Sequence, residues 1–164
     1  MKIKNTFLIM SIMVAAAAAN FQNAQACTGI TLTTTSGAIV PARTIEWAGG
    51  DIGSLYQIVP RGYVQRSLVP GGDRRGMTFK ARYGYVGLAV AQPEYVVDGM
   101  NEAGLVAGLF YFPGYGSYEP YDEHNRSTTI SDFQLVSWIL SRFATVDEVR
   151  QAIADVHVVA VDPR

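Results

Sequence analysis

The spacing of hydrophobic residues changes near Thr128, and this change restricts the fold more than any other feature of the sequence. Before it, short runs rich in Thr, Val, Ile and aromatic residues alternate with Gly, Pro and Ser, which is typical of β-strands joined by turns. After it, apolar residues recur at helical spacing over residues 130–143, which predicts a helix with one wide apolar face. Strands followed by helices favour an α+β fold in which helices cover a sheet.

The expected strands are short and end at turn-forming residues. Residues 27–35 and 38–44 flank Ser36 and Gly37, which predicts a hairpin, and Pro41 limits its second strand to an edge or a bulge. Such a hairpin brings residues 43–46 close to Cys27. Further strands are expected at 55–60, once or twice within 79–91, at 105–112 as a buried strand and at 156–161, with a turn at 101–104 and loops at 70–76 and 114–125.

A second helix is expected over residues 146–155. Thr145 and Glu148 have the spacing of a capping box, in which each side chain binds a free backbone N–H at the start of a helix. Val149 and Ile153 would form the buried face of this helix.

Composition excludes several classes of protein. Hydrophobic residues make up 49% of the chain and charged residues 16%, which suits a folded domain. The formal net charge is −1 and no basic stripe is present, so nucleic acid is not an expected partner. One cysteine and two histidines are too few for a structural metal site, and no metal or cofactor is expected.

Residues 1–26 are typical of a secretory signal peptide. Lys2 and Lys4 precede a short apolar run at 7–19, and Ala24 and Ala26 supply the small residues at a cleavage site. We therefore expect cleavage after Ala26, a mature chain of residues 27–164 in the periplasm or outside the cell, and no stable membrane insertion after cleavage. The alternative is an apolar segment that stays attached as an anchor.

Cys27 is the only cysteine, so it has no partner in the chain for the disulfide that an oxidising compartment favours. Three interpretations remain: a reactive thiol, a lipidated cysteine or a buried thiol. Lipidation requires a bulky aliphatic residue three positions earlier, where this chain has Ala24. As the first residue of a mature chain, Cys27 would carry an α-amine with a pKa of about 7.7–8.0 beside a thiol of about 8.5, so the amine can accept the thiol proton.

Two charged residues follow in the second hairpin strand. A cation near a cysteine favours the thiolate, and Arg43 is placed to supply it across the hairpin. Glu46 lies three residues later, where a carboxylate can orient the α-amine. Either residue alone is more typical of a solvated surface pair.

Five segments together resemble the choloylglycine hydrolases, the family of bile salt hydrolases and penicillin V acylases. They are "ACTGITL", "ARTIEW", "VPRG", "VDGMNEAGLVAGLFYFP" and "DFQLVSWILSRFATVDEVRQAI". The resemblance implies an N-terminal-nucleophile hydrolase with an αββα sandwich, which hydrolyses a linear amide through an acyl-enzyme on cysteine. It implies a small-molecule amide as the substrate and allows a homo-oligomer for the full-length form.

The resemblance also assigns roles to single residues. Cys27 matches the nucleophile and Arg43 the arginine beside it. Glu46 stands where the family usually has an aspartate. Tyr111 stands where bile salt hydrolases have an asparagine and some penicillin acylases a tyrosine, so its backbone N–H would be an oxyanion donor. A second asparagine and a second arginine of the site belong to the part of the family beyond this match, so the chain resembles the N-terminal part of such an enzyme and is not expected to hydrolyse amides alone.

Other polar residues and other functions are weighed against these. Asp98 and Asn101 flank the expected turn and are interpreted as turn-forming. His124 and His157 show no partner in the sequence and are interpreted as structural. The rival functions are a non-catalytic exported binding domain or lipoprotein with a structural or lipidated Cys27, and an acylase of acyl homoserine lactones or fatty amides.

Overall fold

The computed structural model describes residues 27–46, 52–110 and 116–161. Its strands are β1 (Gly29–Thr33), β2 (Ile39–Arg43), β3 (Leu55–Val59), β4 (Val64–Arg66), β5 (Thr78–Lys80), β6 (Tyr85–Ala89), β7 (Val96–Asn101), β8 (Val106–Gly108), β9 (Thr129–Ser131) and β10 (His157–Val159). Its α-helices are α2 (Leu135–Arg142) and α3 (Val146–Ala152), and its 3₁₀ segments are η1 (Glu123–Thr128), η2 (Asp132–Gln134) and η3 (Ile153–Asp155).

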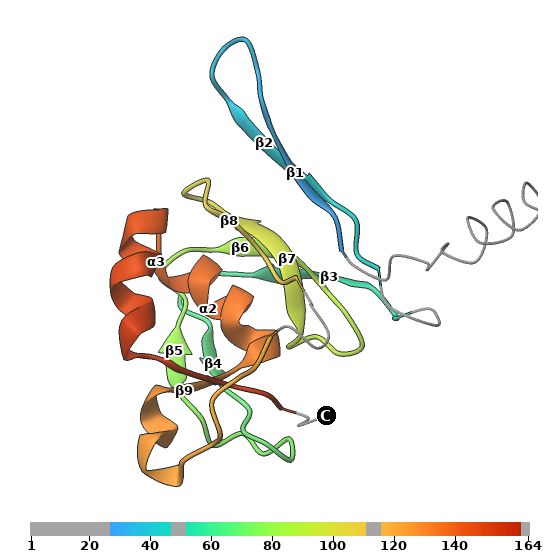
Figure 1. Cartoon of the computed structure of the whole chain (residues 1–164). Helices are drawn as coiled ribbons and strands as arrows, with labels where there is room; N and C mark the ends of the chain where they lie inside the picture. The colour runs from blue at the N-terminus through green and yellow to red at the C-terminus, as the bar shows by residue number, and fades with distance from the viewer. Residues whose placement is uncertain (1–26, 47–51, 111–115, 162–164) are drawn as a thin grey trace, which may run out of the picture.

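A four-stranded antiparallel sheet in the order β3-β6-β7-β8 forms the centre of the fold. Helix α2 lies against this sheet, and the β1–β2 hairpin extends away from it beside β8 (Figure 1). Two smaller pairs accompany it, the antiparallel β4–β5 and the parallel β9–β10. The predicted α+β class, with helices packed on a sheet, is confirmed.

Helix α2 approaches the sheet closely at a strand position that is glycine. Gly87 and Gly99 are register partners in β6 and β7. A Cβ on Gly99 would lie 2.8 Å from Leu140 Cδ1 and 2.6 Å from the Val86 carbonyl oxygen. A larger residue at 99 would collide with α2, so Gly99 permits the close approach, whereas a Cβ on Gly87 would meet Val96 of β7 at 2.6 Å.

The core has two parts, one on each side of α2. The first joins the inner face of the central sheet to the helix, and the second joins β5 and β9 to its other side. Their buried residues are Val59, Ala81, Tyr85, Ala89, Val96, Val136 and Leu140 in the first part and Phe79, Ile130 and Trp138 in the second.

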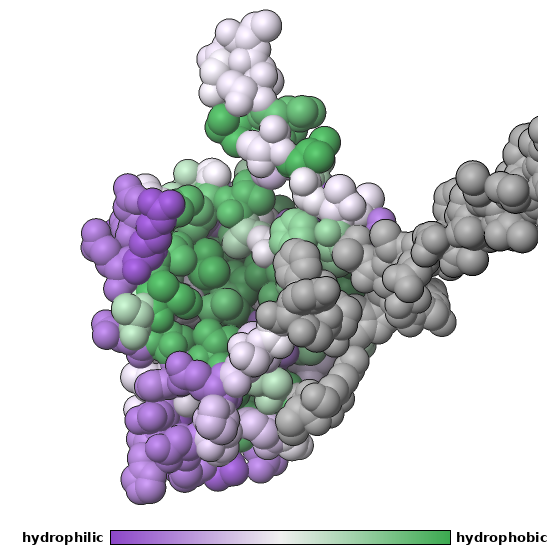
Figure 2. All heavy atoms as spheres, in the orientation of Figure 1, coloured by the Kyte–Doolittle hydropathy of each residue, from purple (hydrophilic) through white to green (hydrophobic). Residues whose placement is uncertain are grey.

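The opposite face of the central sheet is apolar and exposed. Strand alternation places one set of side chains away from α2, and their exposed fractions reach 86% at Tyr56 and 82% at Ile58. The hairpin stem exposes apolar residues as well, and Figure 2 shows them below a more polar tip. The exposed apolar residues of sheet and hairpin are Ile30, Leu32, Ile39, Val40, Leu55, Tyr56, Ile58, Val86, Met100 and Val106.

Several sequence predictions are confirmed. The hairpin forms as expected, with Gly29 opposite Arg43. Thr145 caps α3, because its hydroxyl accepts a hydrogen bond from the Glu148 N–H at 3.2 Å. The last predicted strand is β10, although it pairs with β9 in parallel.

The helix predicted over 130–143 is shorter than expected. Ile130 belongs to strand β9, and α2 begins only at Leu135. Ile130 is fully buried because β9 pairs with β10, and this distant pairing overrides the local helical spacing. The predicted second helix also divides, into α3 and η3.

The buried strand predicted over 105–112 is wrong within the described residues. Strand β8 covers only Val106–Gly108, and Val106 is 37% exposed. The reason is its place at the edge of the sheet order, where one side has no neighbouring strand. Strands β4 and β7 and segment η1 were not predicted.

Candidate active site

A cleft of about 900 Å³ lies between the hairpin and the β7–β8 end of the central sheet. One wall comes from β1 and β2, the other from β8 and the turn before it, and residues 144–146 at the start of α3 close one end. Cys27, Arg43 and Asp98 line it together with mainly apolar or small residues. Among the lining residues, Arg43 is the one cation and Asp98 the one carboxylate.

Cys27 lies at the base of the hairpin and is partly buried. The thiol donates to the Glu46 carbonyl oxygen at 3.8 Å. Thr28 and Thr44 hold the two strands together beside it, since the Thr44 N–H donates to the Thr28 carbonyl at 2.9 Å. The hairpin therefore brings residues 43–46 next to Cys27, as the sequence predicted.

Arg43 joins the hairpin to the central sheet. Its Nη1 donates to the carbonyl oxygens of Leu109 at 2.6 Å and Val97 at 3.2 Å. Its guanidinium also lies over the Phe110 ring, 4.3 Å from the centroid, in a cation–π contact. Only 9% of the side chain is exposed, so the position of this cation is closely fixed.

Asp98 is not the turn residue that the sequence suggested. It lies inside β7, and its Oδ2 is 3.7 Å from Arg43 Nε. Burial raises the pKa of its carboxyl, and the Arg43 charge opposes that rise. The strand signal that could have identified it is the pair of β-branched residues before it, Val96 and Val97, but the neighbouring "DG" pair favoured a turn.

Of the other two predicted site residues, Glu46 and Tyr111, the structure describes Glu46. Glu46 is exposed, and its contact with Cys27 is through its carbonyl oxygen. Its predicted role toward the α-amine stays a prediction. Tyr111 lies outside the described residues.

Asn101 is structural, and its interpretation as a turn residue is confirmed. Its Oδ1 accepts hydrogen bonds from the N–H groups of Ala103 and Leu105, each at 3.0 Å. Its Nδ2 donates to the carbonyl oxygens of Leu140 and Phe143 at the end of α2. The side chain thus joins the β7–β8 turn to the helix.

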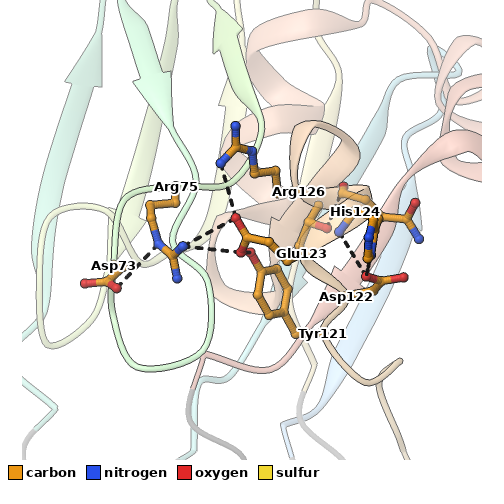
Figure 3. Close-up of polar contacts among 9 residues, drawn as sticks. Asp73, Arg75, Tyr121, Asp122, Glu123, His124 and Arg126 are labelled. Carbon is orange, nitrogen blue, oxygen red and sulfur yellow. Dashed lines mark hydrogen bonds and ion pairs between the residues drawn. The ribbon is translucent and has the colours of Figure 1, made fainter.

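A second group of polar residues is exposed and does not line the cleft (Figure 3). Glu123 accepts hydrogen bonds from Tyr121 at 2.5 Å and from Arg126 at 3.2 Å, and it pairs with Arg75 at 3.3 Å. His124 does have an acidic partner, Asp122 at 2.9 Å, but its side chain is 95% exposed. These contacts connect η1 to the loop before β5, and a solvated surface network of this kind has little influence on a reacting group.

His157 also has an acidic partner, Glu119 at 2.7 Å. Across the described ranges, no group of three or more His, Cys, Asp or Glu residues is arranged to hold a metal ion. In the same part of the chain, no helix has the length and apolar character needed to cross a membrane.

Comparison with known proteins identifies the family that the sequence resembles, and the match covers most of the chain. Residues 27–163 match the model of the linear amide C–N hydrolases, choloylglycine hydrolase family. A bile salt hydrolase/transferase of Clostridium perfringens is 28% identical over 137 residues, which cover 82% of this chain and 40% of the relative. A bile salt hydrolase/transferase of Lactiplantibacillus plantarum is 32% identical over 110 residues, 66% of this chain and 32% of the relative.

Solved structures agree. A penicillin V acylase from Agrobacterium tumefaciens is 27% identical with a TM-score of 0.69, over 81% of this chain and 40% of that one. A conjugated bile acid hydrolase from Clostridium perfringens is 27% identical with a TM-score of 0.64, over 82% and 39% of the two chains. The chain therefore spans about two fifths of the length of these relatives.

Proposed function

Because the chain belongs to the choloylglycine hydrolase family of linear amide C–N hydrolases, we propose that it supplies the nucleophilic part of an amide hydrolase site, with Cys27 as the attacking group. The observation that carries this proposal is the shared cleft. Cys27 lines it with a nearly buried arginine, and its walls are mainly apolar, as a site for the acyl part of an N-acyl amide would require.

The proposed reaction starts with processing. Removal of residues 1–26 during export to the periplasm or the cell exterior frees the α-amine of Cys27. The amine accepts the thiol proton, the thiolate attacks the amide carbonyl, and the leaving amine takes the proton. Water then releases the acid from the thioester. Arg43 favours the thiolate, Glu46 orients the α-amine and the Tyr111 N–H binds the oxyanion.

Export and processing are tested first. Intact-mass measurement and N-terminal sequencing of the exported protein are expected to show an unmodified chain that begins at Cys27. A retained segment 1–26 or a diacylglycerol adduct would remove the free amine, and would favour the exported binding domain or lipoprotein instead.

Hydrolysis is tested on a full-length form, in which residues 27–164 are continued by the C-terminal part that the matched relatives have. The substrates are conjugated bile salts, penicillin V, an N-acyl homoserine lactone and a fatty amide, with release of the free amine as the readout. We expect release from at least one class and its loss in Cys27→Ser, which keeps the size of the side chain and replaces the thiol by a weaker nucleophile.

The same panel with residues 27–164 alone gives a second result. We expect no turnover, because the matched relatives continue well beyond the matched region. Turnover by this segment that disappears in Cys27→Ser would show that it contains a complete site.

A further inference from the structure

Asp98 is a charged residue on an otherwise apolar face. Its register partners in the sheet are Leu88 and Gly108, and the neighbouring Met100 on the same face is 50% exposed. An acid here needs a reason, because a partly buried carboxylate is costly without a partner. Its partner is Arg43, and only 27% of the Asp98 side chain is exposed.

The neutral groups around Arg43 do not balance its charge. The carbonyl oxygens of Val97, Leu109 and Thr44 accept its hydrogen bonds, the last from Nε at 3.3 Å. Carbonyl groups satisfy N–H donors but carry no net charge, and a guanidinium that is 9% exposed still needs a counter-ion. Asp98 is the acidic side chain recorded within ion-pair distance of it in the described structure.

The backbone leaves room for this pair. A Cβ on Gly108 would lie 3.3 Å from Arg43 Nη1 and 3.8 Å from its Cδ. Because Gly108 stands opposite Asp98, the guanidinium can enter beside β8 and reach the carboxylate. Glycine at this register position is thus part of the same arrangement.

We propose that Asp98 is a positioning residue, which holds the Arg43 guanidinium at the wall of the cleft and so maintains its electrostatic support of the Cys27 thiolate. The last clause rests on the proposed function, whereas the positioning itself does not. Asp98 acts through Arg43 and has no assigned contact with substrate. If it is lost, the unbalanced guanidinium leaves its carbonyl partners for solvent, and the thiolate loses a nearby cation.

The first experiment observes Arg43 directly. In the full chain labelled with ¹⁵N-arginine, the Nε–H signal of Arg43 is assigned by its loss in Arg43→Lys, and its exchange with solvent is measured. We expect exchange to become about tenfold faster in Asp98→Asn, because an open guanidinium exposes its N–H groups to water. Unchanged exchange would overturn the proposal. If Asp98→Asn does not fold, Asp98→Ser gives the same test.

The matched control is Asp73→Asn. Asp73 also pairs with an arginine, Arg75, at 3.5 Å, but both side chains are about half exposed or more. This variant removes a carboxylate from an ion pair outside the cleft, so the Arg43 signal should not change. A change equal to that in Asp98→Asn would mean that the effect is one of net charge, which contradicts positioning.

The second experiment measures the thiol. Cys27 is the single cysteine, so its alkylation by iodoacetamide across pH reports one group. Asp98→Asn is expected to slow alkylation at pH 7 several-fold and to move the profile to higher pH. In an Arg43→Met background the same change should not slow it. Faster alkylation by the same factor in both backgrounds would overturn the proposal, because Asp98 would then act on the thiol through space.

These readouts separate the two hypotheses. Faster Arg43 exchange in Asp98→Asn, together with absent amide hydrolysis by the full-length form, would refute the proposed function and leave the positioning role intact. Hydrolysis by the full-length form with unchanged Arg43 exchange would refute the positioning role and leave the proposed function intact.

Discussion

Substitution of Asn101 by alanine tests whether the connection between the β7–β8 turn and α2 stabilises the fold. The side chain is 3% exposed and makes four hydrogen bonds, each between 2.7 and 3.0 Å. Alanine removes all of them and fills little of the space. Two of the groups left behind, the Leu140 carbonyl and the Leu105 N–H, belong to buried residues.

The magnitude follows from where each partner lies. A buried group without a partner costs about 1–3 kcal/mol, and the Leu140 carbonyl is also one of the end carbonyls that α2 cannot satisfy itself. The partners on Ala103 and Phe143 are near the surface, where water replaces the lost bond at a cost of about 0.5–1 kcal/mol each. We therefore expect Asn101→Ala to lower the free energy of unfolding by about 3–8 kcal/mol, a large share of the stability of a small domain.

The assay is urea unfolding of the full chain followed by circular dichroism, with the midpoint and the slope fitted separately. Asn125→Ala is the matched control, since no side-chain hydrogen bond is recorded for this residue of η1 and its carbonyl binds Thr128 and Thr129 in either variant. We expect the control to change stability by about 0.5 kcal/mol or less. A loss below about 1 kcal/mol in Asn101→Ala, at an unchanged slope, would refute the reasoning. Absence of any cooperative transition would agree with the upper end of the range.

Three further predictions concern other parts of the fold. Gly29→Ala would place a Cβ 2.7 Å from the Phe110 ring; we expect a loss of about 1–2 kcal/mol in urea unfolding, absent in a Phe110→Ala background. The pKa of Glu94 lies below its ordinary value of 4.5, chiefly through its hydrogen bond to Arg74. The stability that ionised Glu94 contributes is therefore fully present above pH 4.5, and it is lost as the pH falls through the lowered pKa of the folded state. At pH 7, Glu94→Gln should lower the free energy of unfolding by less than about 1 kcal/mol, because the Arg74–Glu94 pair is exposed. At pH 2 it should lower it by nothing, and an equal loss at both pH values would contradict this prediction. Ala91 has a φ of 62°, which glycine adopts without strain. Ala91→Gly should therefore raise the urea midpoint by an amount that corresponds to about 0.5–1 kcal/mol of stability, and a lower midpoint would contradict this.

The sequence predicted those parts of the fold that depend on residues close together in the chain, namely the β1–β2 hairpin and the cap of α3. The Ser36-Gly37 turn lies between two strand-forming segments, so the hairpin and its register could be inferred, and with them the approach of residues 43–46 to Cys27. The cap at Thr145 depends on one residue three positions away and was inferred for the same reason. The family resemblance predicted Cys27, Arg43 and Glu46 as site residues, and the structure places the first two in one cleft.

Distant contacts account for what the sequence did not predict. Ile130 continues the apolar spacing of α2, but its pairing with Val158 makes it a strand residue. Asp98 sits in a segment whose strand character depends on β6 and β8 at its two sides. No pattern in the residues near Asp98 indicates an arginine in the hairpin as its partner, since the two positions are far apart in the chain.

Arg43 has a double role in this arrangement, and that affects how variants of it are interpreted. In the described residues, the hydrogen bonds that join the hairpin to the central sheet all start from its guanidinium. Its replacement therefore removes a cation near Cys27 and also releases the hairpin that carries Cys27. Loss of activity in an Arg43 variant does not distinguish these effects. A variant of Asp98 does not separate them either, because loss of the counter-ion lets the guanidinium leave its carbonyl acceptors. A variant of Phe110 removes the aromatic contact and leaves both the charges and the carbonyl acceptors in place.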